Sequence, residues 1–167
     1  GTNLFAGTSY SGIYLSSNNG SNWIPVNNGL RNGTVYAVNA TGSNVFAGTW
    51  SGIFKSTSEG ASWSLINNGI NSNIVNSLTA IGSNIFAAST FGGAVSVTTN
   101  NGITWTEVND GLNNFNLLTI GVSGSTLFVG TELNGIYRST NNGLNWYFSG
   151  LSSLTITSFY VSGTTLY

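Results

Sequence analysis

Few side chains in this 167-residue sequence can perform acid–base or nucleophilic chemistry. The sequence has four acidic and three basic residues, and it has no histidine and no cysteine. Thiolate and imidazole nucleophiles, histidine bases, zinc ligands of either type and disulfides are therefore excluded. The best candidate carboxyl pair is Asp110 and Glu132, because a glycosidase needs two acids roughly 5–10 Å apart. Each is at least as well explained as a solvated loop residue, so we expect no catalytic residue, metal or cofactor.

Bulky apolar side chains in turns form a second candidate site. They stand two residues before a recurring glycine, at Tyr10, Trp50, Phe91 and Leu133. Aromatic rings stack on the apolar faces of sugars, and nearby amides can hydrogen-bond hydroxyl groups without charge. The nearby amides are Asn32, Asn71, Asn73, Asn113 and Asn114. These residues predict a site for a neutral glycan, unless each ring lies across the neighbouring unit and only extends the core.

The composition limits the classes of partner. Charged residues are 4% of the chain, against a usual quarter, and the formal net charge is −1. The basic residues are Arg31, Lys55 and Arg138, too few for a phosphate-binding patch, so no nucleic-acid partner is expected. No apolar run reaches the roughly 18 residues that cross a bilayer, so no membrane insertion is expected either. The first residues lack the regions of a signal peptide, and we expect a mature segment.

A fixed period runs through the whole sequence. The phenylalanines of an Asn/Thr-x-Phe-Ala/Val motif, Phe5, Phe46, Phe86 and Phe128, are 41, 40 and 42 residues apart. The tryptophans Trp23, Trp63, Trp105 and Trp146 are spaced by 40, 42 and 41 residues. Two independent markers therefore share one period, which divides the chain into repeats at 1–33, 34–73, 74–115 and 116–154, followed by 155–167.

Each repeat contains four short segments of strand length. In the second repeat they are residues 35–40, 44–48, 52–56 and 63–66, separated by turns rich in Gly and Asn. The first segment alternates apolar and small or polar residues with period two, and no stretch has a useful helical period. Four strands every forty residues are typical of a β-propeller blade. We predict an all-β propeller of four four-stranded blades, a better fit than a leucine-rich solenoid or a sandwich.

An eight-residue motif recurs once in each repeat. It occupies residues 16–23, 56–63, 98–105 and 139–146. It resembles the Asp-box, or bacterial neuraminidase repeat, Ser-x-Asp-x-Gly-x-x-Trp, although Asn18, Ser58, Asn100 and Asn141 replace the aspartate. We expect the Asn or Ser to accept local N–H groups, the Gly to take positive φ and the Trp to fill the gap beside the next sheet. With Glu59 as the one carboxylate in these turns, calcium binding is not expected.

The resemblance implies several functions without choosing among them. Sialidases with this repeat use an arginine cluster and a tyrosine nucleophile, but this chain has only Arg31 and Arg138. The xyloglucanase relatives use two acids on larger propellers, whereas the sortilin-like and photosystem-assembly relatives bind peptides or proteins. We expect a non-catalytic module that binds a glycan or a protein. The alternatives are a structural segment of a large surface protein, with buried turn aromatics, and a glycoside hydrolase using Asp110 and Glu132. An extracellular or cell-surface location is expected.

The two ends of the sequence overlap within the repeat. The chain opens at a second strand, residues 3–7, and supplies a first strand at residues 156–161. In a closed four-blade ring these two segments would pair and remove the exposed edges. Residues 163–167, however, have the sequence pattern of residues 1–5. In such a ring both segments would have to occupy the same second-strand position. We therefore expect a fragment of a longer repeat protein, or a homo-oligomer in which two chains form one ring of eight blades.

Overall fold

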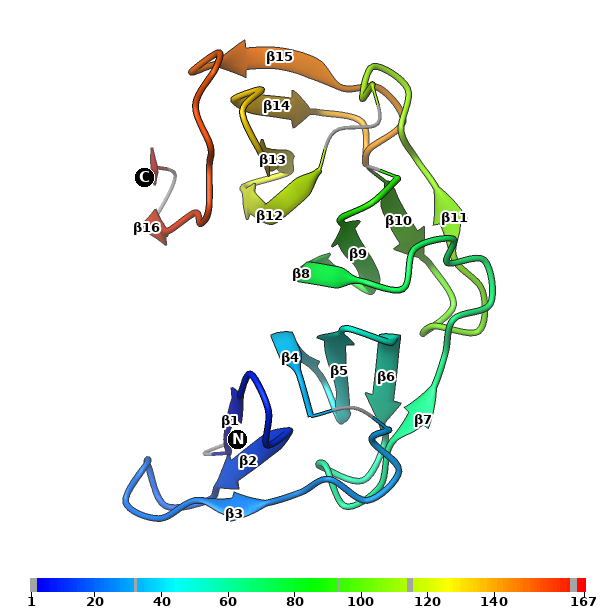
Figure 1. The fold of residues 1–167 in the computed structure, drawn as a ribbon, viewed down its shortest axis with the longest axis vertical. Coiled ribbons are helices and arrows are strands. Elements are labelled where there is room, and N and C mark those ends of the chain that lie inside the picture. Colours follow the sequence, from blue (N-terminus) through cyan, green and yellow to red (C-terminus); the bar gives the residue numbers. More distant parts are fainter. Residues whose placement is uncertain (1–2, 32, 93, 114–115, 163–164) are drawn as a thin grey trace.

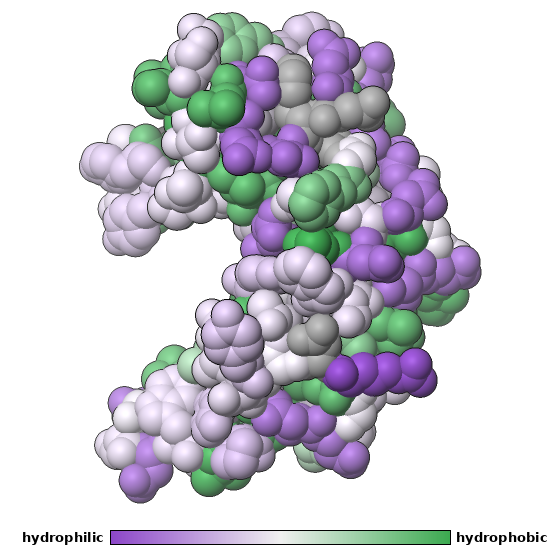
Figure 2. All heavy atoms as spheres, viewed as in Figure 1, coloured by the Kyte–Doolittle hydropathy of each residue, from purple (hydrophilic) through white to green (hydrophobic). Residues whose placement is uncertain are grey.

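The computed structural model describes residues 3–31, 33–92, 94–113, 116–162 and 165–167. Within these residues the chain forms seventeen strands and no helix, which confirms the all-β prediction. The sheets follow one another along an arc, with β4, β8 and β12 lining its inner side and β3, β7, β11 and β15 on its outer side (Figure 1). The arc is open on one side. The space-filling view shows the hollow that lies between its two ends (Figure 2).

The strands of each sheet run in chain order from the inner to the outer side of the arc. The first sheet has three strands, β1 (Leu4–Gly7), β2 (Ile13–Ser16) and β3 (Ile24–Pro25). The second has β4 (Val35–Thr41), β5 (Asn44–Thr49), β6 (Gly52–Ser56) and β7 (Ser64–Leu65). The third has β8 (Val75–Ile81), β9 (Asn84–Ser89), β10 (Val95–Thr98) and β11 (Thr106–Glu107). The fourth has β12 (Leu117–Ser123), β13 (Thr126–Thr131), β14 (Ile136–Ser139) and β15 (Tyr147–Gly150), and a last pair is β16 (Val161–Ser162) with β17 (Thr165–Leu166).

Local sequence explains the hairpins. Gly42 and Gly82 open two-residue turns with φ of 60° and 59°, the left-handed conformation that type II′ hairpins require at this position. Each complete inner strand also shifts register by one residue near its start, for example between Val35 and Ala37. The extra residue, Tyr36, is 43% exposed. A bulge of this kind turns one side chain away from the ladder without ending the strand.

The predicted first strand at residues 156–161 is wrong in its extent. Among the described residues of this segment only Val161 and Ser162 form a strand, and they pair with β17. A β ladder extends only as far as its partner strand, and β17 supplies two residues. Residues 156–160 still follow the path of an inner strand, because the Ile156 N–H donates to the Thr131 carbonyl at 3.0 Å.

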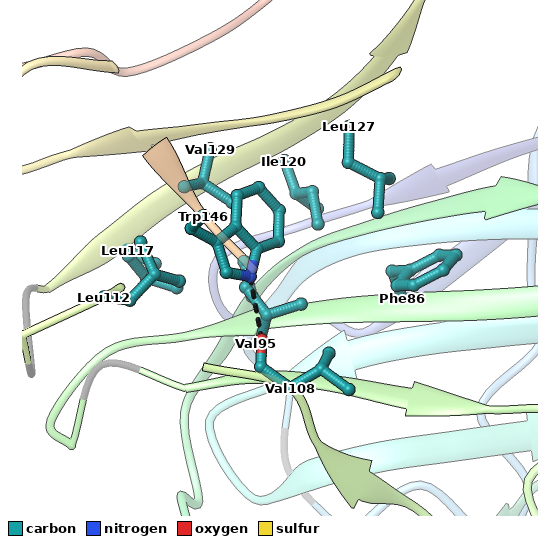
Figure 3. Close-up of a cluster of buried hydrophobic side chains, with 10 residues drawn as sticks. Phe86, Val95, Val108, Leu112, Leu117, Ile120, Leu127, Val129 and Trp146 are labelled. Carbon is teal, nitrogen blue, oxygen red and sulfur yellow. Dashed lines mark hydrogen bonds between the residues drawn. The ribbon is translucent and has the colours of Figure 1, made fainter. Parts of the chain in front are cut away.

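The core lies between neighbouring sheets. Phe46, Phe86 and Leu127, from equivalent second strands, are at most 1% exposed. Between the third and fourth sheets, Trp146 packs among Val95, Leu117, Val129 and their neighbours (Figure 3). Because each apolar cluster draws residues from two successive sheets, no single repeat can bury its own faces.

The eight-residue motifs form the predicted capped turns. In the third repeat the Thr98 hydroxyl accepts a hydrogen bond from the Gly102 N–H at 2.8 Å, and Asn100 Oδ1 accepts one from the Thr104 N–H at 3.0 Å. Gly102 has a φ of 85°. The position of the tryptophan was predicted on the wrong side, since Trp105 packs on the sheet that precedes it and donates from Nε1 to the Ile66 carbonyl at 2.9 Å.

Replacing Thr98 with valine is expected to lower the free energy of unfolding by about 1–3 kcal/mol, because the buried Gly102 N–H then loses its acceptor. Thr98 is fully buried, so water cannot replace the hydroxyl. The matched control is Thr99→Val, at an exposed neighbouring position, which should change the free energy of unfolding by no more than about 0.5 kcal/mol. Urea denaturation followed by circular dichroism measures both. Equal effects of the two variants would contradict the role given to the hydroxyl.

Candidate ligand-binding face

The turns between second and third strands lie beside the segments that link successive sheets. In the first sheet Asn27 joins the two, since its Oδ1 accepts from the Ile13 N–H at 2.7 Å and its Nδ2 donates to the Ser11 carbonyl at 2.9 Å. Asn67 makes the same pair of bonds to Ile53 and Ser51. We call the surface formed by turns 8–12, 49–52, 89–92 and 131–135, together with linking residues 27–31 and 67–74, the loop face.

The four predicted turn side chains are all exposed on the loop face. The exposed fractions are 90% for Tyr10, 52% for Trp50, 70% for Phe91 and 64% for Leu133. Phe91 and Leu133 also have positive φ, 53° and 64°, a conformation in which glycine or asparagine is less strained. Large apolar side chains that remain exposed to solvent contribute little to the stability of this chain.

Two hollows separate the first three aromatic residues. The first, of about 280 Å³, is lined by Ser9, Tyr10, Thr34, Tyr36 and Trp50. The second, of about 370 Å³, is lined by Trp50, Asn71, Ser72, Asn73, Ile74 and Phe91. Trp50 lies between the two and belongs to both. Both linings consist of aromatic, hydroxyl and amide groups with one aliphatic side chain and no charged residue.

The predicted amides differ in their positions. Asn73 lines the second hollow, as does Asn71, whose Nδ2 donates to Glu107 Oε1 at 2.7 Å. Asn113 is exposed but lines neither of the two hollows. Asn32 and Asn114 lie outside the described residues.

Sequence reasoning missed three residues that line the two hollows or join turns of the loop face. Tyr36 reaches the first hollow because it is the extra residue of the β4 bulge, and no turn signal marks it. Ser72 lines the second hollow, where its hydroxyl donates to the Thr90 carbonyl at 2.6 Å. Asn116 bridges two turns, since Oδ1 accepts from the Phe91 N–H at 3.2 Å and Nδ2 donates to Glu132 at 2.8 Å. The break in alternation at Tyr36 was the one signal available in the sequence.

The structure places Asp110 and Glu132 beside two different turns. Glu132 lies in the turn before β14 and accepts from Asn116 Nδ2. Asp110 lies beside the turn after β14, where its carboxylate accepts from Asn145 Nδ2 and its carbonyl from the Trp146 N–H. The two carboxylates therefore have different partners beside opposite ends of β14.

The described residues contain neither a metal-binding cluster nor a candidate membrane-spanning helix. No group of three or more acidic side chains in those residues is placed to hold a metal ion. None of their secondary-structure elements is a helix with the length and hydropathy needed to span a membrane.

Comparison with known proteins identifies the fold. No protein-family model and no curated protein sequence matches the chain. An ancestral GH74 enzyme matches with a TM-score of 0.75 and 27% identity over 87% of this chain. The extracellular domain of the two component system BT4673 from B. thetaiotaomicron matches with a TM-score of 0.75 and 20% identity over 96%. YCF48 from Cyanidioschyzon merolae matches with a TM-score of 0.69 and 16% identity over 98%.

The chain has a β-propeller fold. It spans 22% of the GH74 enzyme, 23% of the BT4673 domain and 59% of YCF48, so each of these proteins is considerably longer. Structures of YCF48 include one bound to D1 peptide, which the chain matches with a TM-score of 0.57 and 18% identity over 81% of its length. The propeller scaffold therefore occurs in an enzyme, in an extracellular domain and in a peptide-binding protein, and the fold by itself does not decide the function.

Proposed function

We propose that this chain is a non-catalytic propeller module that binds a neutral glycan on its loop face. The observation that carries the proposal is the exposed row Tyr10, Trp50 and Phe91, with an uncharged hollow between each successive pair. An aromatic ring covers the apolar face of a sugar, while hydroxyl and amide groups beside it satisfy the sugar hydroxyls. The absence of charge from both hollow linings suits a ligand without charge, because no side chain needs an ionic partner.

The proposed module has no catalytic role and an extracellular or cell-surface location. The different partners of Asp110 and Glu132, beside opposite ends of β14, give no support to a paired-carboxylate mechanism. The likeness to an extracellular domain from B. thetaiotaomicron supports the location. A purely structural segment is less well supported, because such a segment needs no exposed aromatic residues on its turns.

A protein partner is the second candidate for the same face. It is favoured by the structural likeness to YCF48, which has been solved with a bound peptide. Exposed aromatic residues are also common at the centre of protein interfaces. The hollows favour the glycan over the protein partner. A sugar stacks on a flat aromatic ring and needs polar groups beside the edge of that ring, and the hollows supply both.

Replacing Trp50 with alanine is expected to weaken glycan binding by roughly tenfold or more, because this ring borders both hollows. A glycan array finds the ligand, and isothermal titration then gives the dissociation constants. Trp50→Phe keeps a flat ring and should restore most of the affinity. Ile103→Ala removes an exposed side chain from the eight-residue motif of the third repeat and should have no effect.

Two outcomes would contradict the glycan proposal. One is a Trp50→Ala variant that binds its glycan as tightly as the original chain. The other is an array on which the original chain binds no glycan. In the second case a peptide or protein ligand lost on the Trp50→Ala substitution would favour the second candidate.

A further inference from the structure

Asn-Gly steps recur through the chain, and each is a candidate for spontaneous loss of ammonia. Asparagine is chemically labile, and a following glycine has no side chain to shield its backbone nitrogen from the asparagine amide. In the part of the chain that the structure describes, these steps are Asn19-Gly20, Asn28-Gly29, Asn68-Gly69, Asn101-Gly102, Asn134-Gly135 and Asn142-Gly143. The reactivity of each step depends on whether the glycine nitrogen is free to attack.

The steps in the eight-residue motifs are protected by a hydrogen bond. In the third repeat the Gly102 N–H donates to the Thr98 hydroxyl at 2.8 Å, and Gly102 is buried. The equivalent bonds of the first and fourth repeats are both 2.9 Å long. Asn134-Gly135 is protected as well, since the Gly135 N–H donates to the Leu154 carbonyl at 3.1 Å. A hydrogen bond to the neutral N–H disfavours its ionised form, which is the nucleophile of the reaction.

The two steps in the segments that link successive sheets have no such protection. Asn68 and Gly69 are both exposed to solvent, and so are Asn28 and Gly29. Among the described residues, no acceptor is bonded to the N–H of Gly29 or Gly69. In these two steps, therefore, the glycine nitrogen is open to water and to the neighbouring asparagine side chain.

The turn at residues 67–70 accounts for the free N–H. A hydrogen bond of 2.9 Å joins the carbonyl of its first residue to the N–H of its last, and Gly69 has the φ of 91° that a type II turn requires of its third residue. The Asn68 carbonyl accepts from the Trp105 N–H of the following sheet at 2.8 Å. The carbonyl and the N–H of one trans peptide unit point in opposite directions, so the Gly69 N–H points away from that sheet. Residues 27–30 form the same turn with the equivalent hydrogen bonds.

We propose that Asn28 and Asn68 are sites of spontaneous deamidation. The ionised nitrogen of the following glycine attacks the side-chain carbonyl carbon, a C–N bond forms, and the amide nitrogen takes up a proton and leaves as ammonia. Water then opens the resulting cyclic imide at either of its carbonyl groups. The product is aspartate, or isoaspartate, in which the main chain continues through the side-chain carbons. Water is the only co-reactant, and the reaction does not involve the ligand proposed above.

The third repeat shows that the aspartate product is compatible with the fold. Asp110 occupies the position of Asn28 and Asn68 in that repeat, and it also precedes a glycine. Its main-chain carbonyl accepts from the Trp146 N–H at 2.7 Å, as the carbonyl of Asn68 accepts from Trp105. Conversion to aspartate therefore keeps the contact between sheets and adds one negative charge to a chain whose formal net charge is −1.

The isoaspartate product has a different effect, because Cβ of Asn68 becomes a main-chain atom next to Gly69. This point lies against the main chain of Trp105, since a Cβ atom built on Gly69 would be 2.0 Å from the Trp105 carbonyl oxygen. The Trp105 N–H also bonds to the Asn68 carbonyl here. The inserted atom must shift this contact, so isoaspartate is expected to loosen the junction between the second and third sheets.

Peptide mapping by mass spectrometry tests the proposal on the folded chain, incubated in mildly alkaline buffer. Deamidation of Asn28 and Asn68 is expected to be at least roughly tenfold faster than that of Asn101, whose glycine N–H is both hydrogen-bonded and buried. In concentrated urea the three rates should become similar, because the same dipeptide is then unfolded. Equal rates in the folded chain, or no deamidation at Asn28 and Asn68, would overturn the proposal.

A variant tests whether the hydrogen bond is the cause of protection. Thr98→Val removes the acceptor of the Gly102 N–H and is expected to speed deamidation of Asn101 by roughly threefold or more. Thr99→Val, at the exposed neighbouring position, should leave this rate unchanged. Asn142, in the intact motif of the fourth repeat, should stay slow in both variants. An unchanged rate at Asn101 in Thr98→Val, or an equal rise at Asn101 and Asn142, would contradict protection by this bond.

Discussion

Replacing Trp105 with alanine is expected to lower the free energy of unfolding by about 3–5 kcal/mol. The side chain is 4% exposed and belongs to a cluster with Phe46, Ile53 and Val75, which come from two sheets. Truncation removes this apolar contact and leaves a cavity that the surrounding strands cannot close without losing their ladders. It also removes the Nε1 donor of the Ile66 carbonyl. The loss therefore falls on the junction between the second and third sheets.

Two companion variants separate the contributions to this loss. Trp105→Phe keeps much of the packing but not the hydrogen bond, and should cost about 1–3 kcal/mol. Trp50→Ala removes a tryptophan that is 52% exposed and should cost about 1 kcal/mol or less. Urea denaturation of the three variants, followed by circular dichroism, gives the ranking. A Trp105→Ala variant as stable as Trp50→Ala would show that the junction does not depend on this side chain.

Most of the fold could be predicted because the same local sequence signals recur in each of the four repeats. The bounds predicted for the four strands of the second repeat lie within one residue of those of β4, β5, β6 and β7. Glycine at the hairpins and period-two alternation are local signals, and four in-phase copies distinguish them from chance. The capped turns followed for the same reason, since Thr98 bonds to a residue only four positions along the chain.

The errors concern contacts that the repeat does not encode locally. Period and composition are the same whether Trp105 packs on the preceding or the following sheet, so its direction could not be derived. Residues 156–161 have the pattern of an inner strand, but a ladder forms only where a partner exists, and here β17 provides two residues. A strand prediction therefore depends on the neighbouring strand as well as on the segment itself.

The candidate site was predicted in part for a similar reason. The type and spacing of Tyr10, Trp50 and Phe91 are visible in the sequence, but their exposure depends on whether a neighbouring sheet covers them. Tyr36 was missed because a one-residue bulge moves it onto the loop face, and a bulge is set by pairing between strands. The positions of the turns could be predicted from the sequence. The residues that line the hollows could be identified only once the arrangement of the sheets was known.

Replacing Gly69 with alanine is expected to lower the free energy of unfolding by more than about 4 kcal/mol, or to prevent folding. Gly69 has a φ of 91°, which an L side chain adopts only with strain. A Cβ atom there would also lie 2.0 Å from the Trp105 carbonyl oxygen, which is main chain and cannot rotate away. The second and third sheets would have to separate at the contact where the Trp105 N–H bonds to Asn68.

Gly82→Ala is the matched control for Gly69→Ala, because it isolates the cost of positive φ from the cost of the overlap. Gly82 has a φ of 59°, and a Cβ atom there meets nothing within 4 Å. This variant should therefore lose only about 1–2 kcal/mol, the usual cost of a left-handed L residue. Hydrogen exchange should place the loss in Gly69→Ala at the junction of the second and third sheets, and the loss in Gly82→Ala at the β8–β9 hairpin. Similar losses in the two variants would mean that close approach of the sheets at Gly69 contributes little to stability.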